Sequence, residues 1–347
     1  MTRYEYELGR AADIVARNLF ALKPGETFVI TADTESDSHV VDATARAAFA
    51  IGAKPMVIWT ASPLGVGEAA DPMLPVEALT GALMGADAWV EYNNQWLLYS
   101  TPYNVAMKQN KKLRYLCLVG MNPDMMTRCI GRIDFATLQE FQETFSKMLS
   151  ETKHVRITTP AGGDLQYDHI QSIPIRCRMG YANKPGSEML AGQISSTPDF
   201  DTIEGTIVFD GSLVPPCGKL EEPIRLTIEA GTIVKVEGGT QAREFEVWMN
   251  GFDHPQMKRL AHLSYGVNPG AKLTGDIVED ERVWGSTEWG IGSVPAATVP
   301  PDGFPAPSHC DGICMNSSVW LDDEQVLDTG TFIEPQLVRL AEKLGKG

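Results

Sequence analysis

Two histidines and one aspartate are the residues in this chain whose types and spacing best fit metal chemistry. His309 and Asp311 lie two positions apart near the C-terminus, and His262 lies forty-seven residues upstream. In an extended segment alternate side chains share a side, so His309 and Asp311 can face one ion while Cys310 points away. Two imidazoles and one carboxylate leave coordination positions open, as in non-haem Fe(II) oxygenases.

Each half of this set also has a simpler interpretation. His262 stands between Ala261 and Leu263 and could be a half-buried residue without a metal. Asp311 precedes Gly312 and could bond backbone amides in a turn. The sequence has only six histidines, and these two lie close to Gly- and Pro-rich stretches, which predicts a site carried on loops. The two halves together favour a metal site more than either does alone.

Acidic residues supply further candidates for acid–base or metal chemistry. Glu281 and Glu288 belong to the acidic stretch 275–290, and Glu188 follows Pro185-Gly186. These carboxylates could bind a second metal or act as general bases. A solvated acidic loop, common in so anionic a chain, is the alternative.

Aromatic residues could form a flat slot for a planar substrate. Tyr99 follows a predicted strand and Tyr265 lies three residues beyond His262. A tyrosine ring stacks on planar groups and its hydroxyl can donate or accept a proton, so Tyr99 is the candidate for proton transfer or substrate orientation. Ser100 and Trp289 are further candidates for substrate contact, although ordinary packing is the alternative for the tryptophan.

Composition limits the classes of partner. Lys and Arg total 29 against 45 Asp and Glu, which gives a formal net charge of −16. No nucleic acid or anionic membrane is therefore expected as a partner. The N-terminus lacks a signal-peptide pattern and no window has the apolar length of a membrane span, so a cytoplasmic protein is expected. The six cysteines form no C-x-x-C pair, which argues against a disulfide framework or a thiolate zinc site.

The elements that must position these residues fall into two patterns. The first half alternates helical and strand segments, which predicts an α/β domain with a doubly wound parallel sheet over residues 1–152. No dinucleotide or P-loop fingerprint accompanies it, so a nucleotide cofactor is not indicated. From residue 153 onward, short strands are punctuated by Gly and Pro. We therefore expect residues 153–347 to form a β-rich α+β domain that carries the metal site.

The run 263–275, the group 279–281 and the closing 309–312 resemble the aminopeptidase T-like superfamily of leucyl aminopeptidases. Within that superfamily, His262 followed by a Gly-x-x-Pro loop and a late His-x-Asp is most similar to the 2,5-dihydroxypyridine 5,6-dioxygenase family. The similarity extends through 180–186 and the whole second domain. The first domain matches only loosely.

The resemblance implies one Fe(II) bound by His262, His309 and Asp311, with O2 and a small hydroxylated aromatic or N-heterocyclic ring as substrates. It implies ring opening of 2,5-dihydroxypyridine to N-formylmaleamate, and a homo-oligomer. The aminopeptidases typically have a glutamate at the position of His262. A histidine there favours iron, because imidazole suits iron and carboxylate-rich pairs of sites suit hydrolytic metals.

Two departures from the dioxygenase pattern affect proton transfer. The family has one histidine where this chain has Tyr99, and another in the segment that here contains Glu188. If those histidines move protons, Tyr99 or Glu188 must do so here. Glu288 stands where the aminopeptidase-like proteins tend to have a histidine, and Glu281 is kept, so a second metal site is half-present.

An Fe(II)-dependent ring-cleaving dioxygenase is the leading hypothesis, with Glu188 and Glu288 in supporting or proton-transfer roles. One alternative is a dinuclear metallo-aminopeptidase, whose two zinc or cobalt ions would be held by Glu188, Glu281, Glu288, His309 and Asp311. Another is a small-molecule binding protein without catalysis.

Overall fold

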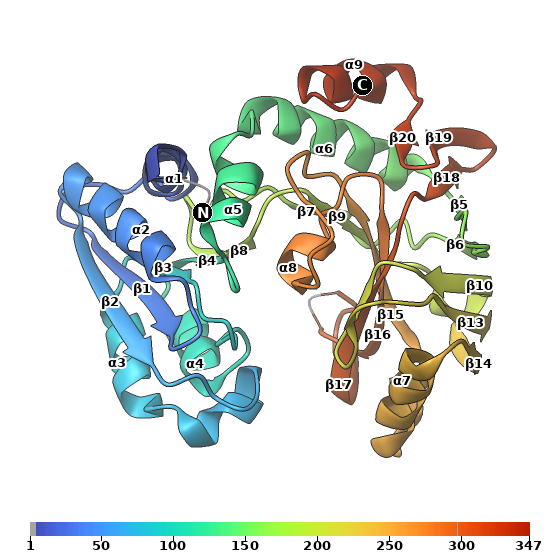
Figure 1. The fold of residues 1–347 in the computed structure, drawn as a ribbon, viewed down its shortest axis with the longest axis horizontal. Coiled ribbons are helices and arrows are strands. Elements are labelled where there is room, and N and C mark those ends of the chain that lie inside the picture. Colours follow the sequence, from blue (N-terminus) through green and yellow to red (C-terminus); the bar gives the residue numbers. More distant parts are fainter. Residues whose placement is uncertain (1–4, 297) are drawn as a thin grey trace. The chain divides into compact units, whose positions relative to one another are not determined.

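The structure is a computed structural model that describes residues 5–296 and 298–347. It divides into two compact units, one formed by Met1–Ile133 with Arg178–Ala191 and the other by Asp134–Cys177 with Gly192–Gly347. Figure 1 shows the elements of each unit along the chain.

The units do not divide at residue 152, where the sequence suggested a boundary. Helix α6 (Phe135–Glu151) belongs to the second unit, because the rings of Phe141 and Phe145 pack there against Phe332. The segment 178–191 returns to the first unit. It does so because its strand β8 (Gly186–Met189) pairs with β4 (Arg114–Cys117).

The first unit contains a five-stranded parallel sheet in the order β2-β1-β3-β4-β8. Strand β1 (Thr27–Asp33) lies between β2 (Lys54–Thr60) and β3 (Ala88–Glu91), so the chain winds outward from β1 in both directions. This confirms the predicted doubly wound sheet. Its helical segments are α1 (Glu5–Asp13), α2 (Ser38–Ile51), α3 (Val76–Gly85), α4 (Thr101–Gln109), α5 (Pro123–Met126), two π-helical turns (Ile14–Leu19, Thr127–Gly131) and a 3-10 helix (Gly67–Met73).

The second unit is β-rich, as expected, with an eight-stranded and a seven-stranded sheet. The eight-stranded sheet contains β14 (Thr232–Glu237), β13 (Ile224–Glu229), β10 (Glu204–Phe209), β6 (Asp164–Asp168), β5 (His154–Thr158), β18 (Ser318–Leu321), β19 (Glu324–Asp328) and β20 (Thr331–Phe332). The seven-stranded sheet contains β12 (Gly218–Lys219), β11 (Ser212–Val214), β17 (Phe304–Cys314), β16 (Thr287–Val294), β15 (Leu260–Gly266), β9 (Gln193–Ser196) and β7 (Arg176–Arg178).

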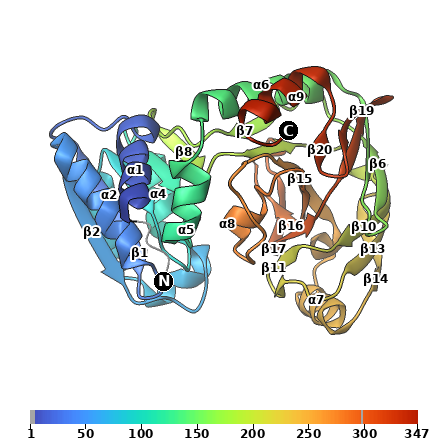
Figure 2. The ribbon, with the colours of Figure 1, turned by 45° about the horizontal axis from the view of Figure 1, so that its top comes forward.

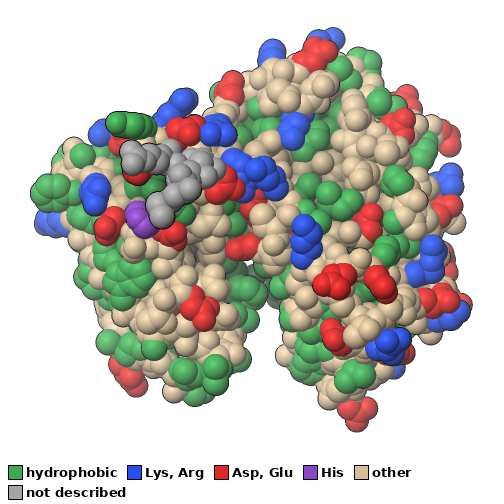
Figure 3. Space-filling view, in the orientation of Figure 1, with side chains coloured by type: hydrophobic (Ala, Val, Ile, Leu, Met, Phe, Trp, Pro, Cys, Tyr) green, Lys and Arg blue, Asp and Glu red, His purple; other side chains and the backbone are tan. Residues whose placement is uncertain are grey.

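Helices close the second unit at one end. Figures 1 and 2 both show α6 and α9 (Pro335–Lys343) side by side there. Its other helical segments are α7 (Thr240–Gly251), α8 (Ile277–Asp280) and two 3-10 helices (Phe200–Thr202, Pro255–Lys258). Among the helices of residues 5–296 and 298–347, none is long and apolar enough to cross a membrane. On the face in Figure 3, acidic and basic side chains are interspersed.

The candidate metal ligands lie on the two strands that flank β16 in the seven-stranded sheet. Strand β16 pairs antiparallel with β15 on one side and with β17 on the other. His309 and Asp311 are in the extended run of β17, which confirms the predicted alternation. The expectation of a loop-borne site is wrong, because His262 lies within β15, His309 and Asp311 lie within β17, and the nearby Gly290-Ile291-Gly292 lies within β16.

Asp134 caps the helix that closes the second unit. Its carboxylate accepts hydrogen bonds from the backbone of Ala136 at 3.1 Å and Thr137 at 3.2 Å, and from the Thr137 hydroxyl. We expect Asp134→Ala to lower the free energy of unfolding by about 1 kcal/mol. The hydrogen bonds from Thr137 lower the pKa of Asp134, so the stabilisation should be present at neutral pH and lost as the pH falls through that lowered pKa.

Urea denaturation at neutral and acidic pH measures this difference. The control is Asp323→Ala, which removes an exposed carboxylate and should change stability by less than about 0.5 kcal/mol. Equal stability of the two variants at neutral pH would contradict the capping role.

Candidate metal centre

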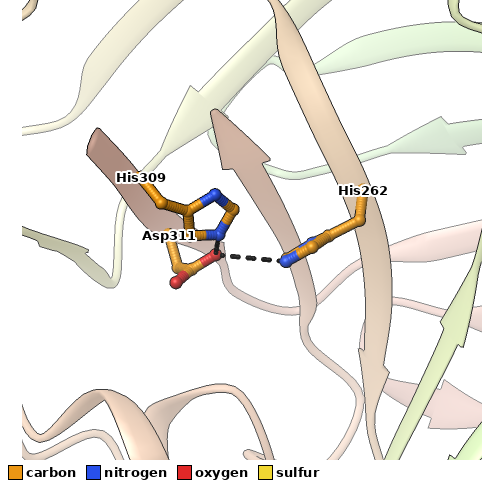
Figure 4. A group of neighbouring side chains, drawn as sticks. All are labelled: His262, His309 and Asp311. Carbon is orange, nitrogen blue, oxygen red and sulfur yellow. Dashed lines mark hydrogen bonds and ion pairs between the residues drawn. The ribbon is translucent and has the colours of Figure 1, made fainter. Parts of the chain in front are cut away.

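Three side chains of the second unit converge on one point (Figure 4). The ligand atoms of His262, His309 and Asp311 all lie within 4.8 Å of one another. Asp311 Oδ1 lies 2.9 Å from His309 Nε2 and 3.5 Å from His262 Nε2. The two imidazoles come from different strands, and their ring centroids are 5.0 Å apart. The structure thus brings together all three metal ligands that the sequence predicted.

The opposite nitrogen of each imidazole has its own partner. His309 Nδ1 lies 2.9 Å from the Ser293 carbonyl oxygen, so this nitrogen is the donor. His262 Nδ1 lies 3.2 Å from Glu288 Oε1. His262 Nδ1 and Glu288 Oε1 are both buried, and neither makes a well-aligned hydrogen bond. The attraction between them is therefore mainly ionic. With the proton held at Nδ1, Nε2 of each ring keeps a lone pair for a metal.

The lone pairs of the two Nε2 atoms point towards Asp311 Oδ1. This arrangement requires a cation between the two nitrogens and the oxygen. Without one, electron pairs on two nitrogens and one oxygen would face one another in a largely buried place. A shared proton or a divalent metal resolves this repulsion. The donor set of two nitrogens and one oxygen suits iron and related metals, and three protein ligands leave positions open for other molecules. The residues present therefore fit a metal cofactor.

Gly290 makes the convergence possible. In the register of the sheet, Gly290 of β16 lies opposite His262 on one side and opposite Asp311 on the other. A side chain at this position would begin 2.7 Å from His262 Cε1 and 2.9 Å from its Nε2. The imidazole occupies the space above the glycine and so reaches across β16 towards Asp311.

Charge at the site shifts the protonation of its members. Burial alone would lower the pKa of His262, but the carboxylates of Glu288 and Asp311 outweigh it and raise this pKa to about 9. Burial would raise the pKa of Asp311, but His309 and His262 lower it to about 2. Burial raises the pKa of Glu288 above its ordinary value, against the effect of His262. The centre therefore favours bound cations, whether protons or metals.

Three of the predicted site residues lie in the first unit. Tyr99 is 54% exposed and has a backbone φ of 68°, a left-handed conformation that is uncommon outside glycine. Ser100 is buried and caps α4 by accepting a hydrogen bond from the backbone of Tyr103. Glu188 accepts hydrogen bonds from the backbone of Met179 and Gly180. The roles of Tyr99, Ser100 and Glu188 in catalysis stay predictions.

Two predicted pocket residues are buried in the second unit. Tyr265 is 1% exposed, and its hydroxyl lies 3.3 Å from that of Tyr167 while its ring packs against Phe145. Trp289 is also 1% exposed and packs edge-on against Tyr167. These contacts give both residues a packing role, and their contact with a substrate stays a prediction.

Sequence reasoning missed the residues that support the ligands. Gly290 was interpreted as part of a loop, and Ser293 contributes only a backbone carbonyl, which no side-chain pattern reveals. Gln193 and Arg282 are buried next to Glu288 and Glu281, yet Gln193 lies 95 positions before Glu288. The glycine repeat in Gly290-Ile291-Gly292 was a usable signal, because glycine within a strand often marks a close approach.

The chain thus combines an α/β unit with a β-rich unit that carries a His/His/Asp group able to hold a metal ion. Residues 16–334 match the family of 2,5-dihydroxypyridine 5,6-dioxygenases, and the chain belongs to this family. It is thus a member of a family of ring-cleaving oxidoreductases, as the sequence motifs suggested.

Known proteins support this assignment. The chain is 25% identical over 323 residues to the 2,5-dihydroxypyridine 5,6-dioxygenase of Pseudomonas putida KT2440, an alignment that covers 87% of this chain and 89% of the relative. The solved structure of 2,5-dihydroxypyridine dioxygenase from the same strain has a TM-score of 0.77 at 22% identity and covers 96% of this chain and 99% of that one. AmpT from Thermus thermophilus has a TM-score of 0.68 at 14% identity, covering 96% and 100%. These two structures share the fold.

A side chain at residue 290 should displace the His262 ring. We expect Gly290→Ala to weaken metal binding by about ten- to a hundredfold, because the new Cβ would lie 2.7 Å from the imidazole. Isothermal titration of the metal-free protein with Co²⁺ measures this loss. Gly251→Ala is the matched control, since an added Cβ there meets no atom within 4 Å. Wild-type affinity in Gly290→Ala would show that the ring does not need this space.

Protons and metal should compete for the same nitrogens. Because the pKa of His262 is raised to about 9, this ring is protonated at neutral pH before a metal binds. The apparent affinity for Co²⁺ should therefore rise by about tenfold per pH unit for each proton displaced, and level off above about pH 9. Titrations in buffers of different ionisation enthalpy count the released protons. An affinity that does not change with pH would contradict the competition.

Proposed function

We propose that this protein is an Fe(II)-dependent dioxygenase that cleaves the ring of 2,5-dihydroxypyridine, or of a closely related hydroxylated N-heterocycle, with O2. Membership of the dioxygenase family and the name of the Pseudomonas putida relative support the reaction and the substrate class. The observation that carries the proposal is the convergence of His262 Nε2, His309 Nε2 and Asp311 Oδ1 from one sheet.

His262, His309 and Asp311 would hold the iron on one face. When bound there, Fe(II) would conduct electron density from the electron-rich ring to O2, so that the ring itself supplies the electrons that reduce O2. The Ser293 carbonyl keeps His309 in the tautomer whose Nε2 faces the metal, and Glu288 does the same for His262. Glu288 has a raised pKa because it is buried, so it can also hold a proton near the site.

Residues beyond the ligands have proposed roles in handling the substrate. Tyr99 is our candidate for proton transfer or ring orientation, with Ser100 next to it in the chain, and about half of the Tyr99 residue, 54%, is exposed. Glu188 is a further candidate for proton transfer, and burial raises the pKa of its carboxyl against the influence of Arg178. Tyr265 and Trp289 would support the pocket from within the core. We also propose that the protein is a homo-oligomer.

Anaerobic purification with elemental analysis, followed by an oxygen-uptake screen, tests the function. The screen should include dihydroxypyridines, gentisate-like acids and aminophenols. Oxygen consumption with a dihydroxypyridine, dependent on added Fe(II), supports the proposal. Peptide cleavage without oxygen, with two metals per chain, would indicate a hydrolase of the type suggested by the AmpT-like fold. Binding of the rings without oxygen uptake would indicate a binding protein.

Removal of a ligand should abolish ring cleavage without unfolding the protein. We expect His262→Ala, His309→Ala and Asp311→Ala each to lower kcat/KM by more than about a hundredfold, because the metal loses one of three ligands. Oxygen uptake and circular dichroism measure activity and fold. The matched control is His39→Ala, which removes an imidazole whose side chain is 77% exposed and should leave activity unchanged. Full activity after any of the three changes would refute the assignment.

A further inference from the structure

Strand β2 is an open edge of the parallel sheet in the first unit. Among the strands that the structure describes, β2 pairs with β1 alone, so no strand lies along its other edge. The inner strands β1, β3 and β4 are almost entirely buried, whereas every residue of β2 is at least partly exposed. An exposed strand edge is a template for pairing with another chain.

The most exposed large side chains of β2 are apolar. Met56, Val57 and Trp59 are 42%, 37% and 46% exposed. Two further exposed apolar residues follow the strand and touch each other, since the Leu64 backbone donates a hydrogen bond to Met73 Sδ at 3.4 Å. Single apolar residues are ordinary on a surface, but neighbouring ones mark an interaction site.

The sequence around β2 lacks acidic residues. Residues 43–67 include no Asp or Glu, although the whole chain of 347 residues has 45. Their two basic residues are Arg46, which pairs with Asp42 at 3.6 Å, and Lys54. Copies of a chain with a net charge of −16 repel one another, so they approach most easily where acids are missing. This pattern favours a second copy over a partner recognised by charge.

Alternate residues of β2 direct their backbone groups to the open edge. Lys54 donates a hydrogen bond to the Glu26 carbonyl oxygen at 2.7 Å, so the even-numbered residues of β2 face β1. Val57 and Trp59 therefore present both N–H and C=O outwards, and Pro55 presents only its C=O. A two-fold axis near Val57 would place these donors opposite the same acceptors of a second, antiparallel copy.

The surface has the length that a stable contact needs. A seven-residue strand is about 23 Å long, and a stable interface buries about 800 Å² on each copy. The strand alone is too narrow for this area, so side chains beside it must contribute. Phe49 of α2 is 74% exposed, and Figures 1 and 2 both show α2 beside β2. Phe49, Leu64 and Met73 thus extend the apolar surface before and after the strand.

We propose that β2 is the contact between two copies of this chain, which pair edge to edge and antiparallel so that their sheets become continuous. Val57 and Trp59 form the centre of this contact. Such a contact is isologous, because each copy contributes the same strand. The inference rests on the homo-oligomer proposed above and adds the surface that forms it.

Charged substitutions at Val57 test the proposal on the full chain. Val57→Glu brings two carboxylates together in an apolar contact and should raise the dissociation constant at least about thirtyfold. A two-fold contact doubles an assembly, so its loss should halve the mass measured by sedimentation velocity. Val57→Lys should have the same effect. The matched control is Val247→Glu, at a 73% exposed valine of α7, which should leave the mass unchanged.

Mixing the two variants tests whether the same strand lies on both sides. The two copies of position 57 lie near each other across the axis, so the carboxylate of one variant can pair with the ammonium of the other. An equimolar mixture of Val57→Glu and Val57→Lys should therefore regain the wild-type mass. Variants that had merely lost their fold would not recover on mixing.

Three outcomes would overturn the proposal. A wild-type mass for Val57→Glu would place the contact elsewhere on the molecule. A mixture that stays dissociated would exclude the antiparallel two-fold arrangement. A wild-type protein that is monomeric at about 100 times the concentration used in an activity assay would leave this edge to a strand of another protein.

Hydrogen exchange of the wild type decides the question if circular dichroism shows that the variants do not fold. The outward amides of Val57 and Trp59 should exchange slowly in the assembled protein and rapidly once dilution dissociates it. The amides of Met56 and Ile58 face β1 and should stay slow in both states. Rapid exchange at Val57 and Trp59 in the assembled protein would overturn the proposal.

These measurements separate the contact from the proposed reaction, because they contain neither a ring substrate nor O2. An assembly that Val57→Glu halves, in a protein that cleaves no ring, would refute the dioxygenase and leave the contact intact. Ring cleavage by a monomeric wild type would do the reverse.

Discussion

The centre depends on one geometric constraint, which is that His262 must reach a carboxylate two strands away. Strand β16 separates the strand of His262 from that of Asp311, and neighbouring strands are about 4.8 Å apart. Only a residue without a side chain leaves room for an imidazole to lie across the middle strand. Gly290 fills that position, and its register with both ligands places all three in one row across the sheet. The hydrogen bonds between these paired strands hold the ligand-bearing backbone rigidly in place.

The same sheet also arranges the electrostatics around the ligands. Glu288 is two positions before Gly290 on β16, so it points to the same face and meets the back of the His262 ring. Gln193 belongs to β9 of the same sheet, and its side chain lies between Glu288 and Arg282, which follows α8. Ligand geometry and charge are therefore coupled: a change in strand register would disturb both at once.

The sequence revealed those parts of the molecule that follow from local periodicity. The alternation in His309-Cys310-Asp311 predicted two ligands on one face, and both lie in the strand β17. The placement of His262 in a loop was wrong, because Gly and Pro near a strand resemble the punctuation of a loop. Pairings between distant segments could not be predicted, since the link from Gln193 to Arg282 spans 89 positions. The division of the chain into units was also not predictable, because β8 pairs with β4, a strand distant from it in the sequence.

The return of residues 178–191 to the first unit has a consequence for biosynthesis. The parallel sheet lacks its fifth strand until β8 has left the ribosome, after the first strands of the other unit have been made. Until then β4 is an unprotected edge, with free amides and carbonyls able to recruit another chain. Nascent polypeptides that stop before Gly186 would keep this edge open, so the protein's vulnerability to aggregation is greatest midway through translation.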